Sequence, residues 1–351
     1  MAFFASVSID GNPTMSWRAP WMEIEWSTMP KTRLIVYPDA EENLAPLFTG
    51  ERLARLEKLG KFTAYYGGPP SNEEYIRRIS GADAIISGWG LTNEVLEAAV
   101  NLDCMSFIGL GAASVVDINE AARLGVTVTH TLSAADTIAE HTVALMLAAS
   151  RNIARLDRDM RDGVFNMELQ GFDLRGKTLG LIGFGRIARA VVPLVRAFGM
   201  QVVAWTRNPK SEDAARLGIE FRNLDDLIAE SDVLSLHLLL SPDTDGLIDA
   251  ARLRKTKPGV VIVNTARSQV LDEVTMVELL ATGHIASAGL DVFNEEPLPP
   301  GHPLIKLDNV VLTPHVAYNT PEAVAGMIDI SIDNLEAFFR GAPKNVTVSS
   351  S

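Results

Sequence analysis

The chain has 351 residues, of which 47% are hydrophobic and 21% charged, and its net charge is −13. This is the composition of a globular protein, and the length exceeds what one hydrophobic core serves, so we expect two domains. The acidic excess disfavours nucleic acids and membranes as partners, and the single cysteine, Cys104, excludes an intrachain disulfide and fits a reducing, cytoplasmic location.

The first 30 residues differ from the rest of the chain. They hold three of the five tryptophans, with no clear periodicity and no basic segment before the letters FFASVSI. A secretory signal needs such a basic segment, so we interpret residues 1–30 as an N-terminal extension, an upstream leader rather than a signal peptide. The most apolar helical run, near 143–150, is too short to cross a membrane.

From Lys31 onward, short apolar segments alternate with helical ones. The first series of predicted strands comprises 32–37, 83–87, 105–109 and 125–129. The segments EEYIRRIS and DINEAARLG between them have helical patterns, and this alternation predicts a parallel, doubly wound α/β sheet. A long helix is then predicted from Ser133 to Arg161, closed by Gly163.

A second alternating series predicts a complete dinucleotide-binding sheet. Its seven strand candidates are 178–183, 201–205, 219–221, 233–237, 260–264, 286–291 and 310–315. Thr320 and Pro321 are a good cap and first-turn pair for a last helix, which should stop at Gly341. We expect the first hundred or so residues to form a separate domain, to which this helix returns.

The segment Gly183-Phe-Gly185-Arg186-Ile187-Ala188 fits the pattern G-x-G-x-x-G/A between an apolar strand and a helical segment. Gly183 permits the tight turn, and Gly185 lets the backbone approach a pyrophosphate. The phosphates would meet free N–H groups at the helix start, where Arg186 and Ile187 lie. The pattern predicts a dinucleotide site, and the alternative is a glycine turn between packed elements.

The end of the following strand reads Thr206-Arg207-Asn208, where an acid would bind the ribose 2′-OH. Without that acid nothing repels a 2′-phosphate, and Arg207 can pair with one. The cofactor is therefore expected to be NADP or NAD, with the balance toward NADP. The alternative is that Arg207 is a solvated loop residue.

Titratable residues follow three later strands: Arg267, the pair Glu295 and Glu296, and His315. The carboxyl ends of parallel strands line the ligand crevice of such a sheet, so these side chains should converge. Arginine can hold a carboxylate with two hydrogen bonds, and a carboxylate behind a histidine favours its charged form. Each residue taken singly has an alternative interpretation. Arg267 could belong to a surface ion pair, Glu296 could be a loop acid, and His315 could be a core histidine.

From about Ile108 to Asn319 the sequence resembles the D-isomer-specific 2-hydroxyacid dehydrogenase family. The matching segments are GLGAASVVDINEAARLGV, AEHTVALMLAASR, GKTLGLIGFGRIA, VNTAR, GLDVFNEEP and TPH. The resemblance implies a Rossmann cofactor domain over 132–316, inserted into a flavodoxin-like substrate domain of residues 31–131 and 317–351. It also implies a homodimer built through the cofactor domain, with the helical segment 140–150 as a contact.

The resemblance implies roles for individual residues. His315 is expected to be the acid/base, Glu296 its partner, and Arg267 the group that binds the substrate carboxylate and carbonyl. Asp291 is expected to meet the nicotinamide carboxamide. The remaining implied contacts are Thr265 and Ala266 at the nicotinamide ribose, and the backbone of Gly109, Leu110, Gly111 and Ala112 at the substrate carboxylate.

The implied activity is hydride transfer between a nicotinamide cofactor and a small 2-keto or 2-hydroxy acid. The main alternative is a dinucleotide-sensing, corepressor-like protein on the same fold, and a formate-type enzyme is disfavoured by the glutamate at 296. Ser268-Gln269 and Leu239 depart from the family pattern, as does Thr206. The other histidines show no metal-ligand spacing, so no metal is expected: His130, His141, His237, His284 and His302.

Overall fold

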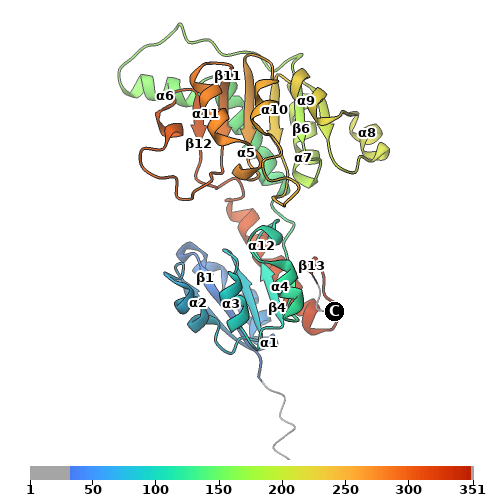
Figure 1. Cartoon of the computed structure of the whole chain (residues 1–351). Coiled ribbons are helices and arrows are strands. Elements are labelled where there is room, and N and C mark those ends of the chain that lie inside the picture. Colours follow the sequence, from blue (N-terminus) through green and yellow to red (C-terminus); the bar gives the residue numbers. More distant parts are fainter. Residues whose placement is uncertain (1–31, 349–351) are drawn as a thin grey trace, which may run out of the picture. The chain divides into compact units, whose positions relative to one another are not determined.

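The computed structural model describes residues 32–348, so the predicted extension 1–30 lies outside the described residues. The chain contains two α/β domains, each built on its own sheet (Figure 1). One sheet has six strands in the order β13-β5-β4-β3-β1-β2, and the other has seven in the order β12-β11-β10-β9-β6-β7-β8. Every strand pairing is parallel except that of β13 with β5. This confirms the predicted fold class.

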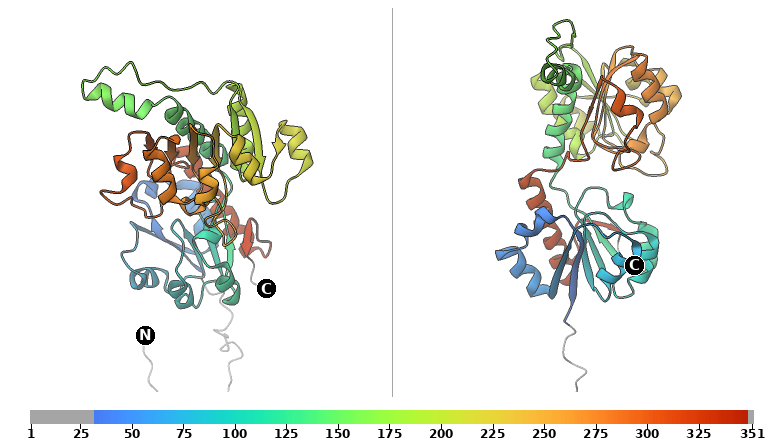
Figure 2. Two further views of the ribbon diagram at one scale, coloured as in Figure 1. Left: turned by 45° about the horizontal axis from the view of Figure 1, so that its top comes forward. Right: turned by 90° about the vertical axis from the view of Figure 1, so that its left-hand side faces the viewer.

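The six-stranded sheet carries helices on both faces (Figure 2). Its strands are β1 (Leu34–Ala40), β2 (Lys61–Tyr66), β3 (Ala84–Ser87), β4 (Cys104–Phe107), β5 (Thr127–Thr129) and β13 (Val346–Val348). Helices α1 (Gly50–Leu59) and α12 (Pro321–Phe339) cover one face and share a core with Ile35 and Ile86. Helices α2 (Asn72–Ile79), α3 (Asn93–Ala98) and α4 (Ile118–Arg123) cover the other.

The seven-stranded sheet is likewise buried on both faces. Its strands are β6 (Thr178–Ile182), β7 (Gln201–Trp205), β8 (Glu220–Phe221), β9 (Val233–Leu236), β10 (Val260–Asn264), β11 (Ile285–Leu290) and β12 (Val310–Leu312). One face packs against α5 (Ala135–Ser150), α7 (Arg186–Ala197) and α8 (Ser211–Leu217). The other packs against α9 (Leu224–Glu230), α10 (Ala250–Arg254) and α11 (Glu273–Ala281). All seven predicted strands of this series are present.

Two expectations about elements are wrong. The single helix predicted over 133–161 is two helices, α5 and α6 (Ile153–Arg161), because Asn152 between them has a left-handed backbone with φ of 54°. Strands β2 and β13 were not expected. Short 3₁₀ turns η2 (Glu42–Leu47), η3 (Ala112–Ser114), η4 (Ser268–Val270) and η5 (Pro303–Lys306) complete the fold.

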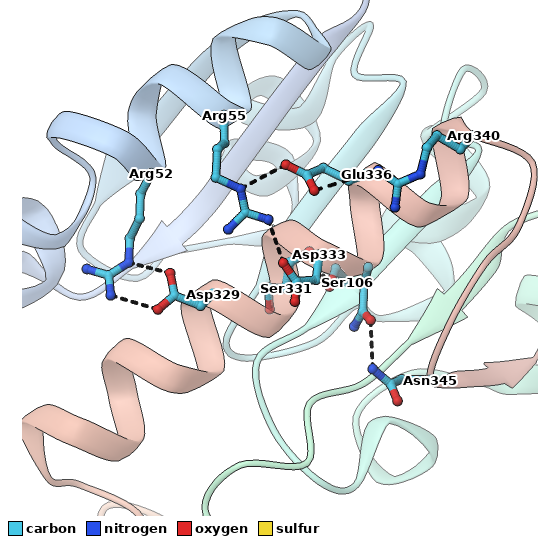
Figure 3. Close-up of polar contacts among 10 residues, drawn as sticks. Arg52, Arg55, Ser106, Asp329, Ser331, Asp333, Glu336, Arg340 and Asn345 are labelled. Atoms are coloured by element: carbon cyan, nitrogen blue, oxygen red, sulfur yellow. Dashed lines mark hydrogen bonds and ion pairs between the residues drawn. The ribbon is translucent and has the colours of Figure 1, made fainter.

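Helix α12 begins and ends as expected. The Thr320 hydroxyl accepts a hydrogen bond from the Ala323 N–H at 3.2 Å, Pro321 opens the first turn, and Gly341 follows the last turn with φ of +75°. Ion pairs join α12 to α1 (Figure 3). Within residues 32–348, no helix combines the length and apolar character that a membrane crossing requires.

Candidate active site

The bend between β6 and α7 has the shape that a pyrophosphate needs. Gly183 has φ of +93°, and a Cβ there would lie 2.5 Å from the carbonyl oxygen of His237. Gly185 has open space where a Cβ would point, and among the described residues no side chain caps the start of α7. The first N–H groups of α7 are therefore available, and these residues fit a dinucleotide.

The end of β7 carries the residues expected to read the ribose. Thr206 is half-buried and Arg207 is exposed. The Arg207 guanidinium pairs with Asp243 at 3.0 Å, and both side chains are more than half exposed. An exposed ion pair of this kind contributes little free energy, so Arg207 is available to a phosphate.

Arg267 follows β10 in a turn shaped by Asn264. The Asn264 side chain accepts a hydrogen bond from the Ala266 N–H and donates one to the Arg267 carbonyl, both at 3.0 Å. Beside it, the Thr265 hydroxyl is 2.9 Å from that of Thr142 on α5. The turn is therefore held by side chains rather than by sheet pairing.

The Arg267 guanidinium lies against the loop that follows β4. Its Nη1 donates to the Ala266 carbonyl at 2.7 Å and its Nη2 to the Ser114 hydroxyl at 3.2 Å. A Cβ on Gly111 would lie 3.2 Å from the same Nη2, so glycine permits this close approach. Burial lowers the pKa of Arg267, although the charge of Glu296 opposes that shift. The guanidinium stays protonated, because arginine begins from a very high pKa.

His315 and Glu296 form a hydrogen-bonded pair. Nδ1 of His315 is 2.8 Å from Oε2 of Glu296, whose Oε1 accepts a hydrogen bond from the Phe293 N–H at 2.9 Å. Burial alone raises the pKa of Glu296, but the hydrogen bonds and the charges of His315 and Arg267 outweigh it and lower the pKa below its usual value. With Nδ1 engaged, Nε2 is the nitrogen left to exchange a proton with a ligand.

Asp291 holds the backbone around His315. Its carbonyl accepts the His315 N–H at 2.8 Å, and its buried carboxylate accepts the N–H groups of Val316 and Ala317, both at 2.9 Å. Thr313 donates its hydroxyl to the same carboxylate at 2.6 Å. His315 has φ of 53°, a strained conformation for a non-glycine residue, and these bonds maintain it. Among the described residues, Oδ2 accepts a hydrogen bond from the Ala317 N–H alone, so one of its lone pairs is unused.

The structure thus brings Arg267, Glu296 and His315 to one place, together with the 109–112 loop. Ser114 and Asn264, which hold Arg267, were not singled out from the sequence, although both lie inside the family-like segments GLGAAS and VNTAR. His237, next to the glycine bend, is half-buried, and desolvation of its ring lowers its pKa to about 4.

The expected contact segment 140–150 is largely unavailable to a partner. Val143, Leu145, Met146 and Ala149 are buried against the chain's own seven-stranded sheet. Ala144 is exposed and Leu147 and Ala148 are partly exposed, so these are the apolar residues left for the predicted dimer contact, which stays a prediction. Within residues 32–348 we find no group of three or more His, Cys, Asp or Glu side chains arranged to hold a metal.

Comparison with known proteins adds four findings. Residues 143–317 match the family model for the NAD binding domain of D-isomer specific 2-hydroxyacid dehydrogenase. A glyoxylate reductase of Thermofilum pendens is 40% identical over 284 residues, 78% of this chain and 83% of that protein. A D-3-phosphoglycerate dehydrogenase of Archaeoglobus fulgidus is 38% identical over 278 residues, 78% of this chain and 52% of that protein. An acyclic imino acid reductase, solved with NADPH and D-Arg, is 30% identical with a TM-score of 0.80, covering 90% of this chain and all of that one.

Proposed function

Since the chain belongs to the D-isomer-specific 2-hydroxyacid dehydrogenase family and is a nicotinamide-dependent oxidoreductase, we propose that it reduces a small 2-keto acid at the site around His315, Glu296 and Arg267. The observation that carries this proposal is the 2.8 Å pair between His315 Nδ1 and Glu296 Oε2, close enough to Arg267 for their charges to interact. An acid/base group and a carboxylate-binding cation are the two side-chain functions that this reduction requires.

Substrate binding is assigned to Arg267 and the loop 109–112. The guanidinium carries its N–H donors along its edges, and its contact with Ser114 places it beside the backbone of that loop. In this proposal the loop N–H groups and Arg267 hold the substrate carboxylate, and Arg267 also polarises the keto oxygen. Such fixed donors stabilise the negative charge that develops on that oxygen.

Proton transfer is assigned to His315. When bound, the reduced nicotinamide supplies the hydride that the keto carbon accepts. The carbonyl electron pair then moves onto oxygen, which takes the proton from Nε2 of His315 and becomes the hydroxyl. Glu296 stabilises the imidazolium beforehand, and Asp291 keeps the histidine backbone in place. Oxidation of the hydroxy acid runs through the same groups in reverse.

The residues that would hold the cofactor are Gly183, Gly185, Arg186 and Ile187 at the pyrophosphate, and Thr206 with Arg207 at the ribose. Thr265, Ala266 and Asp291 would contact the nicotinamide side. The absence of an acid at position 206 and the exposed guanidinium of Arg207 support NADP over NAD.

We further propose the domain limits 31–131 with 317–351, and 132–316, for substrate and cofactor binding. The positions of the strands support these limits, because 34–129 and 346–348 supply one sheet and 178–312 the other. We also propose a homodimer and, from the lone buried Cys104, a cytoplasmic location.

The test is the oxidation of NADPH and of NADH with a panel of 2-keto acids. His315→Gln should lower kcat by at least about a hundredfold, since general acid catalysis contributes that much, while cofactor Kd changes little. His284→Gln is the matched control, because among the described residues the His284 side chain bonds only to Thr256. Unchanged turnover in His315→Gln would refute the assigned mechanism.

A further inference from the structure

The segment Gly88-Trp89-Gly90-Leu91 leaves the six-stranded sheet beside the proposed carboxylate loop. Strands β3 and β4 are parallel neighbours whose last residues, Ser87 and Phe107, are in register. The segments that follow them therefore leave the sheet side by side, at the carboxyl ends of the strands. Ligands bind at these ends in sheets of this kind. The first of these segments has no role in the function proposed above.

Direct contacts join the two segments. The Leu91 N–H donates to the Val115 carbonyl at 3.0 Å. Gly90 has φ of +92°, and a Cβ there would lie 2.2 Å from the same carbonyl oxygen, so only glycine fits this approach. Val115 follows Ser114, whose hydroxyl bonds to Arg267. Trp89 is thus connected by a short path of contacts to the group that binds the substrate.

A buried carboxylate fixes the backbone that carries Trp89. Asp39, at the end of β1, accepts the N–H groups of Gly88 and Trp89 at 3.0 and 3.1 Å. It also accepts the hydroxyls of Tyr75 and Ser87, both at 2.9 Å, and Ser87 in turn accepts the Gly90 N–H at 3.0 Å. A carboxylate that accepts this many hydrogen bonds, itself buried, is a rigid anchor.

The indole itself is left uncovered. Trp89 is 66% exposed, whereas Leu91 in the same segment is 4% exposed. Burying a tryptophan is strongly favourable, and a rigid backbone that holds one in solvent keeps an apolar surface ready for a ligand. The sequence places no cation in 88–91 or in 109–115, and Asp39 lies behind the segment. These two segments suit an apolar group and supply no cation of their own, while the nearby Arg267 is assigned to the substrate carboxylate and not to a second anionic group.

We propose that Trp89 is the specificity-determining residue of this enzyme, that it contacts the substituent on the keto carbon, and that it selects 2-keto acids with an apolar substituent over phosphorylated ones. Asp39 is the positioning residue that holds Trp89 in place. This inference rests on the proposed function, because it takes the substrate carboxylate to bind at the loop 109–112 and Arg267.

The test compares three 2-keto acids: glyoxylate, which has no substituent, 4-methyl-2-oxopentanoate, which has a branched apolar one, and 3-phosphohydroxypyruvate. The wild-type protein should prefer the apolar acid to the phosphorylated one. Trp89→Ala should lower kcat/KM for 4-methyl-2-oxopentanoate by about 10- to 100-fold and change that for glyoxylate less than about twofold, since apolar contacts discriminate by this amount. Trp89→Phe should restore most of the loss.

Two further variants sharpen the test. Val100→Ala is the control, because Val100 is also an exposed apolar residue, at 86%, but precedes β4 and so lies at the amino ends of the strands. Asp39→Asn should raise KM for 4-methyl-2-oxopentanoate more than it changes kcat for glyoxylate. If Asp39→Asn does not fold, the Trp89 variants test the inference by themselves. Equal losses on all three acids in Trp89→Ala, or a wild-type preference for the phosphorylated acid, would overturn the inference.

A binding measurement separates this inference from the proposed function. Acrylamide quenching of Trp89, obtained as the difference between wild type and Trp89→Phe, is recorded with oxidised cofactor so that no turnover occurs. We expect 4-methyl-2-oxopentanoate to protect Trp89 and 3-phosphohydroxypyruvate not to do so. Protection without any turnover would refute the proposed function only, whereas turnover without protection would refute the role of Trp89 only.

Discussion

His315 is fixed at both ends by the segment that follows β11. Asp291 accepts the N–H groups of residues 315–317, and Glu296 accepts a hydrogen bond from the ring. Holding a histidine in the left-handed region costs about 1 kcal/mol or more, which these bonds offset. The side chain can therefore keep one orientation before substrate arrives, as acid/base catalysis requires.

Thr206 is the residue at which cofactor preference should be decided. In Thr206→Asp the new carboxylate would accept the ribose 2′-OH and repel a 2′-phosphate. We expect the ratio of KM for NADP to KM for NAD to rise by at least about tenfold, measured with one keto acid at saturation. Glu220→Asp, at the nearby edge strand β8, should leave the ratio unchanged. An unchanged ratio in Thr206→Asp would mean that another residue discriminates between the cofactors.

The residues of the site differ in how far sequence alone could indicate them. The sequence indicated His315, Glu296 and Arg267 as candidates, because each is a titratable residue within a few positions of a strand end. Ser114 and Asn264 were not indicated, because a polar residue that supports an arginine has no distinctive spacing. Trp89 was also missed, since the anchoring of its segment by Asp39, 50 residues earlier, is visible only in three dimensions.

At the scale of elements, the ion pairs between α1 and α12 give the domain of the six-stranded sheet a stability that depends on pH. Arg52 pairs with Asp329, and Arg55 with Asp333 and Glu336 (Figure 3). The hydrogen bonds from these arginines hold the pKa values of Asp329 and Glu336 below their usual range. Carboxyls with lowered pKa values stabilise the fold above the pKa of the unfolded chain and lose that effect as the pH falls through the folded value.

Arg55→Met tests this coupling. It should lower the free energy of unfolding by about 1 kcal/mol at pH 7, because partly exposed pairs in a network contribute at that level. The difference from wild type should begin to shrink below about pH 4, the pKa of these carboxyls in the unfolded chain, and should vanish as the pH falls through their lowered pKa values in the folded wild type. Urea unfolding followed by circular dichroism at several pH values measures it. Arg161→Met is the control, since Arg161 pairs only within its own helix, with exposed Asp157.

Strand β2 and the boundary between α5 and α6 escaped the sequence patterns for different physical reasons. β2 is an edge strand with mixed exposure, so its letters KFTAYY lack the continuous apolar run of a central strand. α5 and α6 carry helical patterns almost without interruption, and only the left-handed Asn152 separates them. Local conformation at one residue decided this boundary, and helical periodicity does not detect it.

At the scale of the whole molecule, α6 and the segment after it expose several apolar side chains among charged ones. Both lie at the periphery of the seven-stranded domain (Figures 1 and 2). The exposed apolar side chains there are Ile153, Met160, Val164, Phe165 and Met167, and Phe165 and Met167 are 75% and 81% exposed. A patch of this kind is typical of an interaction site, and the proposed occupant is a second copy of the chain.

The double variant Phe165→Asp with Met167→Asp should therefore weaken the homodimer. Light scattering after size exclusion should give twice 38.0 kDa for the wild-type protein and about the single-chain mass for the variant at micromolar concentration. Val274→Asp changes an equally exposed apolar residue on α11 and should remain dimeric. A dimeric double variant would place the contact on another surface.

The pairing of β13 with β5 has a consequence for biosynthesis. All strands of the seven-stranded sheet lie between residues 178 and 312, so they are translated before α12 and β13. At about 5–20 residues per second, a few seconds separate the synthesis of β12 from that of β13. During that interval β1 to β5 lack α12 on one face and β13 beside β5, so apolar surface that the finished domain buries is still exposed.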